Sequence, residues 1–267
     1  MDKVNPQRRI SRPPVRVIAR LDVKGPNVVK GIQLEGLRIV GKPQEMARRY
    51  YRAGIDELLF MDIVASLYQR NSILDIVRAT AAEAFVPITV GGGLRSVEDA
   101  VGAIRSGADK VAINTAAIAR PAFLTEIAHA LGSQAVVVSI EAKRRAGGWE
   151  ALTDNGRERT GVDALAWAAE AERLGAGELL ITSIDREGST QGMDLELLAE
   201  IRRRVQIPVI ASGGVGRSEH VSDVLSRDLA NAVACAHVLH YQVCDVASVK
   251  ARLASDGVPV RPIPAFS

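Results

Sequence analysis

The sequence has few cysteines, few aromatic residues and no hydrophobic run long enough to cross a membrane. Cys235 and Cys244 are its only cysteines among 267 residues, and their spacing indicates neither a disulfide framework nor a metal site. Aromatic residues make up 4% of the chain, which gives little support to base stacking on nucleic acid. We therefore expect a cytoplasmic protein that needs no metal, cofactor, nucleic acid or membrane.

Basic residues gather at the start of the chain, although the net charge of the whole is only +3. The segment "MDKVNPQRRISRPPVR" contains no apolar stretch of the kind that a secretory signal requires. We expect residues 1–14 to form a basic, disordered tail and residues 15–267 to form a single domain.

Short apolar runs rich in β-branched residues alternate with helical patterns through this domain. Helical patterns such as "PQEMARRYYRAG" and "SVEDAVGAIRSG" end on glycine, the usual residue after a helix C-terminus. Eight strand–helix repeats at this length predict an α/β fold, a closed (β/α)8 TIM barrel of parallel strands. The expected strands are Val15–Val23, Glu57–Ile63, Val86–Val90, Lys110–Ile113, Ala135–Glu141, Glu178–Ile184, Pro208–Ala211 and Ala232–Ala236.

The two halves of the chain resemble each other. The segment "GIDELLFMDI" is repeated as "GAGELLITSI" 121 residues later, and "VPITVGGGLRS" as "IPVIASGGVGRS" at the same offset. The segment "VRVIARLDVK" is similar to "QAVVVSIEAK", 119 residues further on. Three pairs at nearly one offset predict a barrel built from two duplicated (β/α)4 half-barrels.

Carboxylates end two of the expected strands at equivalent places in the halves. Active sites of such barrels lie at the C-terminal ends of the strands, where Asp22 and Glu141 follow strands one and five. Strands one and five face each other across the barrel, so the two residues can act as general acid and general base. A single acid at a strand end is as often a structural anchor for a loop, and the duplicated placement favours catalysis.

Glycine pairs follow strands three and seven, and they predict a phosphate site at each end of the substrate. A glycine pair lets backbone N–H groups approach an anion closely, although it also permits a tight turn after a strand. The long loop after strand one has the composition of a lid, and Lys30 within it can reach a phosphate. The first site would contain Gly92, Gly93, Asn114 and Thr115, and the second Gly213, Gly214, Ala236 and His237.

The motifs "RVIARLDVK", "PITVGGGLRSVEDA", "GADKVAINTAA", "GSQAVVVSIEAKR", "GAGELLITSIDREG" and "IPVIASGGVG" carry a family resemblance. As a set they resemble the cyclase subunit of imidazole glycerol phosphate synthase, over about residues 16–261. The resemblance implies a heterodimer with a glutaminase that supplies ammonia. The cyclase would convert a bis-phosphorylated ribulosyl aminoimidazole intermediate to imidazole glycerol phosphate and aminoimidazole carboxamide ribotide, in histidine biosynthesis.

The resemblance also implies roles for individual residues. The two catalytic aspartates of the family match Asp22 and Glu141, and its lid lysine matches Lys30. Together with the glycine pairs, the implied substrate and phosphate contacts are Asp62, Gly92, Gly93, Asn114, Thr115, Thr182, Glu187, Gly188, Ser212, Gly213, Gly214, Ala236 and His237.

Four charged residues stand at the starts of the strands, at the opposite end of the barrel from the catalytic site. Two cations and two anions there can form a ring of salt bridges, which usually serves stability at this face. The resemblance implies an ammonia gate instead, with Asp109 beside it contacting the glutaminase. The ring would consist of Arg16, Glu57, Lys110 and Glu178.

Three positions depart from the family pattern inside the substrate site. Glu141 and Glu187 each replace an aspartate, and His237 stands where a small serine is usual. These departures leave two alternatives open. One is a cyclase-like subunit that channels ammonia and activates a glutaminase in the biosynthesis of amidino sugars. The other is the phosphoribosyl isomerase of the histidine pathway, which uses the same carboxylate pair and no partner.

Overall fold

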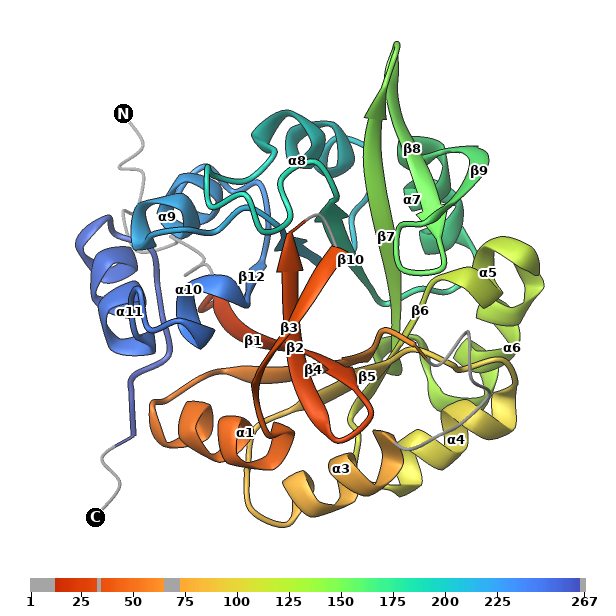
Figure 1. Cartoon of the computed structure of the whole chain (residues 1–267). Coiled ribbons are helices and arrows are strands. Elements are labelled where there is room, and N and C mark those ends of the chain that lie inside the picture. The colour runs from red at the N-terminus through yellow and green to blue at the C-terminus, as the bar shows by residue number, and fades with distance from the viewer. Residues whose placement is uncertain (1–12, 33–34, 65–72, 265–267) are drawn as a thin grey trace, which may run out of the picture.

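Eight parallel strands close into a barrel in the computed structural model, which describes residues 13–32, 35–64 and 73–264 (Figure 1). Each strand pairs with the next around the ring, and pairing of β10 with β7 and of β12 with β1 completes the closure. The predicted (β/α)8 fold is confirmed, and each expected run overlaps a barrel strand. The barrel strands are β1 (Arg16–Lys24), β4 (Glu57–Asp62), β5 (Ile88–Gly91), β6 (Lys110–Ile113), β7 (Val136–Arg145), β10 (Glu178–Ser183), β11 (Val209–Ser212) and β12 (Ala232–Cys235).

Helices surround the ring of strands on its outer side (Figure 1). Local sequence fixes several of their ends: Pro43 begins α1, and Ser96 caps α4 by accepting a hydrogen bond from the backbone of Asp99. The helices are α1 (Pro43–Arg52), α3 (Ile73–Ala81), α4 (Val97–Arg105), α5 (Thr115–Ala119), α6 (Ala122–Leu131), α7 (Ala164–Arg173), α8 (Leu195–Arg202), α9 (Ser218–Leu225), α10 (His237–His240) and α11 (Val246–Ser255), with a 3-10 turn at Ser133–Ala135. No helix in the described ranges is long and apolar enough to span a membrane.

An antiparallel hairpin follows the first barrel strand of each half. In the first half β2 (Asn27–Ile32) and β3 (Glu35–Gly41) pair with each other, and β2 also pairs with the end of β1. In the second half β8 (Gly148–Thr153) and β9 (Glu158–Asp163) do the same beyond β7 (Figure 1). The expected loop after strand one is therefore a hairpin, and Lys30 lies on a strand.

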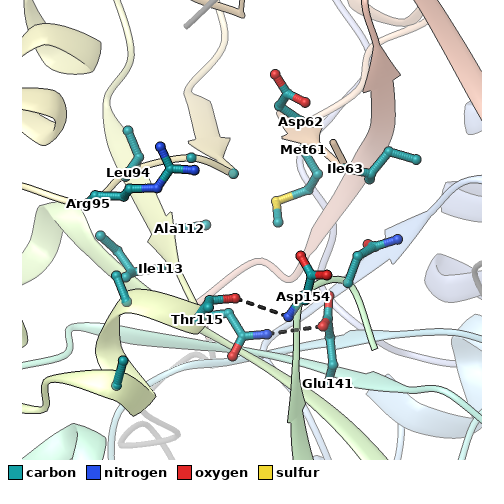
Figure 2. Close-up of a pocket in the computed structure, with 16 residues that line it drawn as sticks. Met61, Asp62, Ile63, Leu94, Arg95, Ala112, Ile113, Thr115, Glu141 and Asp154 are labelled. Carbon is teal, nitrogen blue, oxygen red and sulfur yellow. Dashed lines mark hydrogen bonds between the residues drawn. The ribbon is translucent and has the colours of Figure 1, made fainter. Parts of the chain in front are cut away.

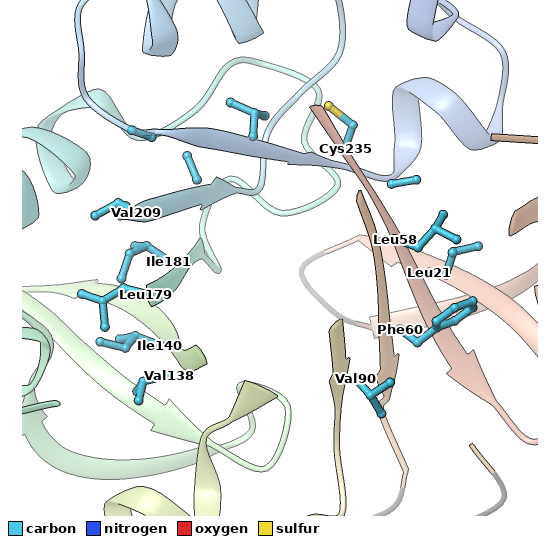
Figure 3. Packing of buried hydrophobic residues seen from close by; sticks show 14 of the residues in the cluster. Leu21, Leu58, Phe60, Val90, Val138, Ile140, Leu179, Ile181, Val209 and Cys235 are labelled. Carbon is cyan, nitrogen blue, oxygen red and sulfur yellow. The ribbon is translucent and has the colours of Figure 1, made fainter. Parts of the chain in front are cut away.

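The apolar core has two layers, because successive strand residues point to opposite sides of the barrel wall. Outward-facing residues such as Leu21, Phe60 and Val90 belong to the large cluster that includes the helices (Figure 3). A second cluster contains alternate residues of the same strands and fills the barrel interior, with Ile18 and Leu180 among its members.

One charged residue interrupts this interior. The sequence analysis described the expected strands as apolar runs, and that description is wrong at Arg20, which is only 2% exposed. The predicted basic tail lies almost wholly outside the described residues, which begin at Pro13.

Candidate active site

Asp22 and Glu141 lie on opposite sides of the barrel, because β1 and β7 are four strands apart in a ring of eight. Both carboxylates are buried, with 4% and 3% exposure. Their hydrogen-bond partners differ in kind. Asp22 accepts a 2.8 Å bond from Nε of Arg20, whereas Glu141 accepts a 3.0 Å bond from the side-chain amide of Asn114.

These surroundings move the two pKa values in opposite directions. Burial raises the pKa of Glu141 to about 7, and the attraction of Arg20 only partly offsets it. Burial also acts to raise the pKa of Asp22, but Arg20 and Lys30 outweigh it and hold that pKa below its usual range. Asp22 is therefore ionised at neutral pH, whereas Glu141 holds its proton more readily than an ordinary carboxyl group, and a pair of this kind can serve as a base and an acid.

A cavity of about 230 Å³ opens beside Glu141, between the ends of β4, β5 and β6 and the β8–β9 turn. Figure 2 shows Glu141 and Thr115 on one side of it, with Thr115 accepting a 3.1 Å hydrogen bond from the backbone of Asp154. The lining includes the predicted residues Asp62, Gly92, Gly93, Asn114, Thr115 and Glu141, but not Asp22.

Two amide atoms on this wall keep hydrogen-bonding capacity. The side-chain oxygen of Asn114 and the side-chain nitrogen of Asn155 are buried and have no protein partner within the described part of the chain. Asn155 stands in the β8–β9 turn with a φ of 56°.

Glycine is required where the backbone turns beside this cavity. Gly92 has a φ of 93°, and a Cβ placed on it would stand 2.1 Å from the carbonyl oxygen of Asp62. Gly213, which matches Gly92 at the offset of 121 residues, has a φ of 95°, and its Cβ would stand 2.8 Å from the carbonyl oxygen of Ser183, the residue that matches Asp62. The two glycine pairs thus have matching backbone conformations and matching close contacts.

The second glycine pair surrounds a much smaller space, of about 10 Å³. Lys30 reaches into it from β2 and forms an ion pair with Glu187, with both side chains almost fully buried. Burial and the positive charge of Lys30 lower the pKa of the neighbouring His237, so its imidazole is neutral at pH 7. The predicted residues around this space are Lys30, Glu187, Gly188, Ser212, Gly213, Gly214, Ala236 and His237.

The four predicted charges at the other end of the barrel form a closed ring of ion pairs. Glu57 accepts from Nη1 of Arg16 at 2.6 Å and lies 3.2 Å from Nζ of Lys110. Glu178 pairs with the same two cations, at 2.8 Å from Lys110. Asp109 beside the ring accepts a 2.8 Å hydrogen bond from the backbone nitrogen of Ile88.

The sequence analysis missed Arg20, which links Asp22 on β1 to the ends of β10 and β11. Arg20 contacts Asp22 and also donates hydrogen bonds to Thr182 and Ser212, so Thr182 faces Arg20 and does not line the cavity. The alternation of side chains along a strand could have revealed Arg20, because it precedes Asp22 by two residues and therefore points to the same side of the strand. The analysis also missed Asn155, which only the shape of the β8–β9 turn brings to the cavity. The described residues contain no group of side chains arranged to hold a metal ion.

Comparison with known proteins agrees with this architecture. The "Histidine biosynthesis protein" family matches residues 16–245. An imidazole glycerol phosphate synthase subunit HisF from Legionella pneumophila is 60% identical over 206 residues, covering 77% of this chain and 97% of the relative. HisF subunits from Myxococcus xanthus and Thermobifida fusca are 49% and 47% identical, each covering 92% of this chain and 97% and 98% of the relative.

Proposed function

The chain belongs to the histidine biosynthesis family, among the HisF subunits of imidazole glycerol phosphate synthase, and we propose that it is the cyclase of that enzyme. It adds ammonia to a bis-phosphorylated ribulosyl aminoimidazole intermediate and closes the imidazole ring. The products are imidazole glycerol phosphate and aminoimidazole carboxamide ribotide. The observation that carries the proposal is the opposed pair of buried carboxylates with divergent pKa values, placed between two matching glycine pairs.

The two carboxylates divide the proton transfers of the reaction. Asp22 is ionised and accepts a proton from the attacking nitrogen, while the protonated Glu141 donates one to a departing oxygen or nitrogen. A donor with a pKa near the working pH is efficient because it both holds its proton and gives it up readily. Glu141 lines the cavity and so meets substrate directly, and Asp22 acts from the opposite side of the barrel.

The two glycine pairs bind the two phosphates of the substrate. The first pair works with Asn114 and Thr115 at the mouth of the larger cavity. At the second pair, the incoming phosphate takes the place of Glu187 as the partner of Lys30, since these two side chains form an ion pair in that small space. Asn155 and Asp62 contact the middle of the substrate.

A glutaminase partner supplies the ammonia. The matched relatives are each named as a subunit, which supports a complex. The partner would dock at the end of the barrel that carries the ring of Arg16, Glu57, Lys110 and Glu178, with Asp109 in contact. The ring then acts as the gate through which ammonia enters the barrel.

Purified protein tests the proposal directly. The ribulosyl substrate is incubated with an ammonium salt at high pH, where free ammonia is abundant and the partner is unnecessary. Formation of imidazole glycerol phosphate is the expected result. Asp22→Asn should abolish ring closure and leave the affinity for the bis-phosphate nearly unchanged. Absence of product from the unaltered protein, or normal turnover by Asp22→Asn, would refute the proposal.

A second candidate function is supported by the closed ion pair at the second glycine pair. Lys30 is already neutralised by Glu187 in a space of about 10 Å³, as expected of a barrel that conducts ammonia without cyclising a bis-phosphate. Such a subunit would activate its glutaminase for an amidino-sugar pathway. It would show no ring closure in the assay above and would still stimulate a co-purified glutaminase.

A further inference from the structure

Arg20 lies inside the barrel beside the Asp22 carboxylate. It is 2% exposed, and its guanidinium donates to Asp22 at 2.8 Å, to Thr182 at 2.9 Å and to Ser212 at 3.2 Å. These bonds join β1 to β10 and β11 across the interior. A buried arginine held by three oxygen acceptors has little freedom to move, and neither has the carboxylate that it binds.

Charges around Arg20 come from several elements. Asp22 on β1, Glu141 on β7 and Glu187 after β10 all attract the guanidinium, and they keep it charged although burial opposes the charge. Lys30 on β2 also acts on Asp22, as does His240 on α10. Glu141 further interacts with Asn114 and with the backbone of Gly156.

The second half of the barrel has no such cation at the equivalent place. The offset of 119 residues that relates Asp22 to Glu141 relates Arg20 to Ser139, which is buried on β7. The arginine therefore hydrogen-bonds one carboxylate of the pair and acts on the other only through space. Arg20 makes the two equivalent positions chemically different, together with Lys30, which also lowers the pKa of Asp22.

We propose that Arg20 is a positioning residue for the cyclase reaction, which fixes the Asp22 carboxylate, keeps it ionised as the base and leaves Glu141 to carry the proton. This inference rests on the proposed function. It assigns Arg20 no contact with substrate, because the side chain lies outside the linings of both cavities. It acts on Asp22 through a hydrogen bond and on Glu141 through space, where its charge lowers the pKa.

Three variants separate charge from shape. Arg20→Met keeps much of the volume and removes the charge, Arg20→Lys keeps the charge and loses the fork of donors, and Arg173→Met removes an exposed arginine as the control. Loss of an opposite charge at hydrogen-bond distance raises a carboxylate pKa by about 1–3 units. In Arg20→Met the low-pH limb of kcat should therefore move up by about 1–3 pH units, with little change in KM. Arg20→Lys should lower kcat and leave that limb in place.

Each variant is compared with the unaltered protein at the same pH, which cancels the ionisation of ammonia itself. A second readout follows the ligand-free carboxylates of Asp22 and Glu141 by NMR of protein labelled with 13C in the side-chain carboxyl groups. In Arg20→Met, Asp22 should titrate at a higher pH than in the unaltered protein. In Arg20→Lys and Arg173→Met it should titrate at nearly the same pH as in the unaltered protein. An unmoved limb and an unmoved Asp22 titration in folded Arg20→Met would overturn the proposal.

The two readouts distinguish failure of this inference from failure of the proposed function. If the unaltered protein does not close the ring, the proposed function fails, and the carboxylate titrations still decide whether Arg20 controls Asp22. If Arg20→Met does not fold, Arg20→Gln takes its place and must show the same upward shift. Equal Asp22 titration in the lysine and glutamine variants would then refute the role of the charge.

Discussion

Replacing Glu141 with glutamine should stabilise the protein at alkaline pH while it destroys activity. The buried carboxylic acid has a pKa of about 7 in the folded chain, against 4.5 for the ordinary side chain. Glutamine has nearly the same shape, and its side-chain oxygen can still accept the hydrogen bond from Asn114. The substitution removes the ionisation and keeps the hydrogen bond from Asn114.

The sign and the size of this change in stability follow from proton binding at Glu141. Between pH 4.5 and 7 the folded state holds a proton on Glu141 that the unfolded state has released, so stability falls as the pH rises through this window. The full difference in pKa corresponds to at most about 3 kcal/mol, all of it lost above pH 7. Glutamine does not titrate. The free energy of unfolding of Glu141→Gln should therefore rise by about 3 kcal/mol relative to the unaltered protein between pH 4 and pH 8.

Urea unfolding at a series of pH values measures this difference, with the fluorescence of the buried Trp149 and Trp167 as the signal. Glu158→Gln on β9 is the control, since Glu158 is exposed and should show no such trend. Loss of the general acid should lower kcat by about 10²–10⁴-fold in Glu141→Gln. A stability difference that stays constant from pH 4 to pH 8 would show that Glu141 titrates normally and that the acid–base assignment is wrong.

Two further predictions concern stability. Glu57→Gln leaves both cations of the ring with one anion, so it should lower the free energy of unfolding by about 3 kcal/mol. The control Glu126→Gln breaks an exposed ion pair and should lower the free energy of unfolding by less than about 1 kcal/mol. Equal losses in urea unfolding would deny the ring a structural role. Gly92→Ala should destabilise by more than about 2 kcal/mol because its Cβ meets a carbonyl oxygen, while Gly102→Ala, in open space within α4, should stabilise by about 0.5–1 kcal/mol. Thermal unfolding that ranks the two alanine variants the other way would contradict the backbone geometry.

The sequence predicted the barrel well because its strands are short buried runs separated by regular helical patterns. The ring at the strand starts was also predictable, since Arg16, Glu57, Lys110 and Glu178 begin strands that meet at one end of a closed barrel. The β2–β3 hairpin was not predictable, because its segment "VVKGIQLEGLRIV" contains glycines and polar residues typical of a loop. Only its pairing with β1 makes it part of the sheet.

The chemistry of the site was predictable in part. Placement of Asp22 and Glu141 at opposed strand ends followed from the repeat. Their different pKa values did not, because these depend on burial and on the contact between Asp22 and Arg20. Arg20 itself was readable from strand alternation, whereas its bonds to Thr182 and Ser212 require the closed barrel.

The exchange of Arg20 for Ser139 between the halves has a wider consequence. Two copies of one half-barrel, joined with perfect twofold symmetry, would place identical acids in identical surroundings, and neither could be assigned a fixed part in a proton relay. Duplication alone thus supplies a barrel with two matching halves. Division of labour begins when the copies acquire different neighbours, and the arginine that one half has and the other lacks is one place where the symmetry of the scaffold is broken.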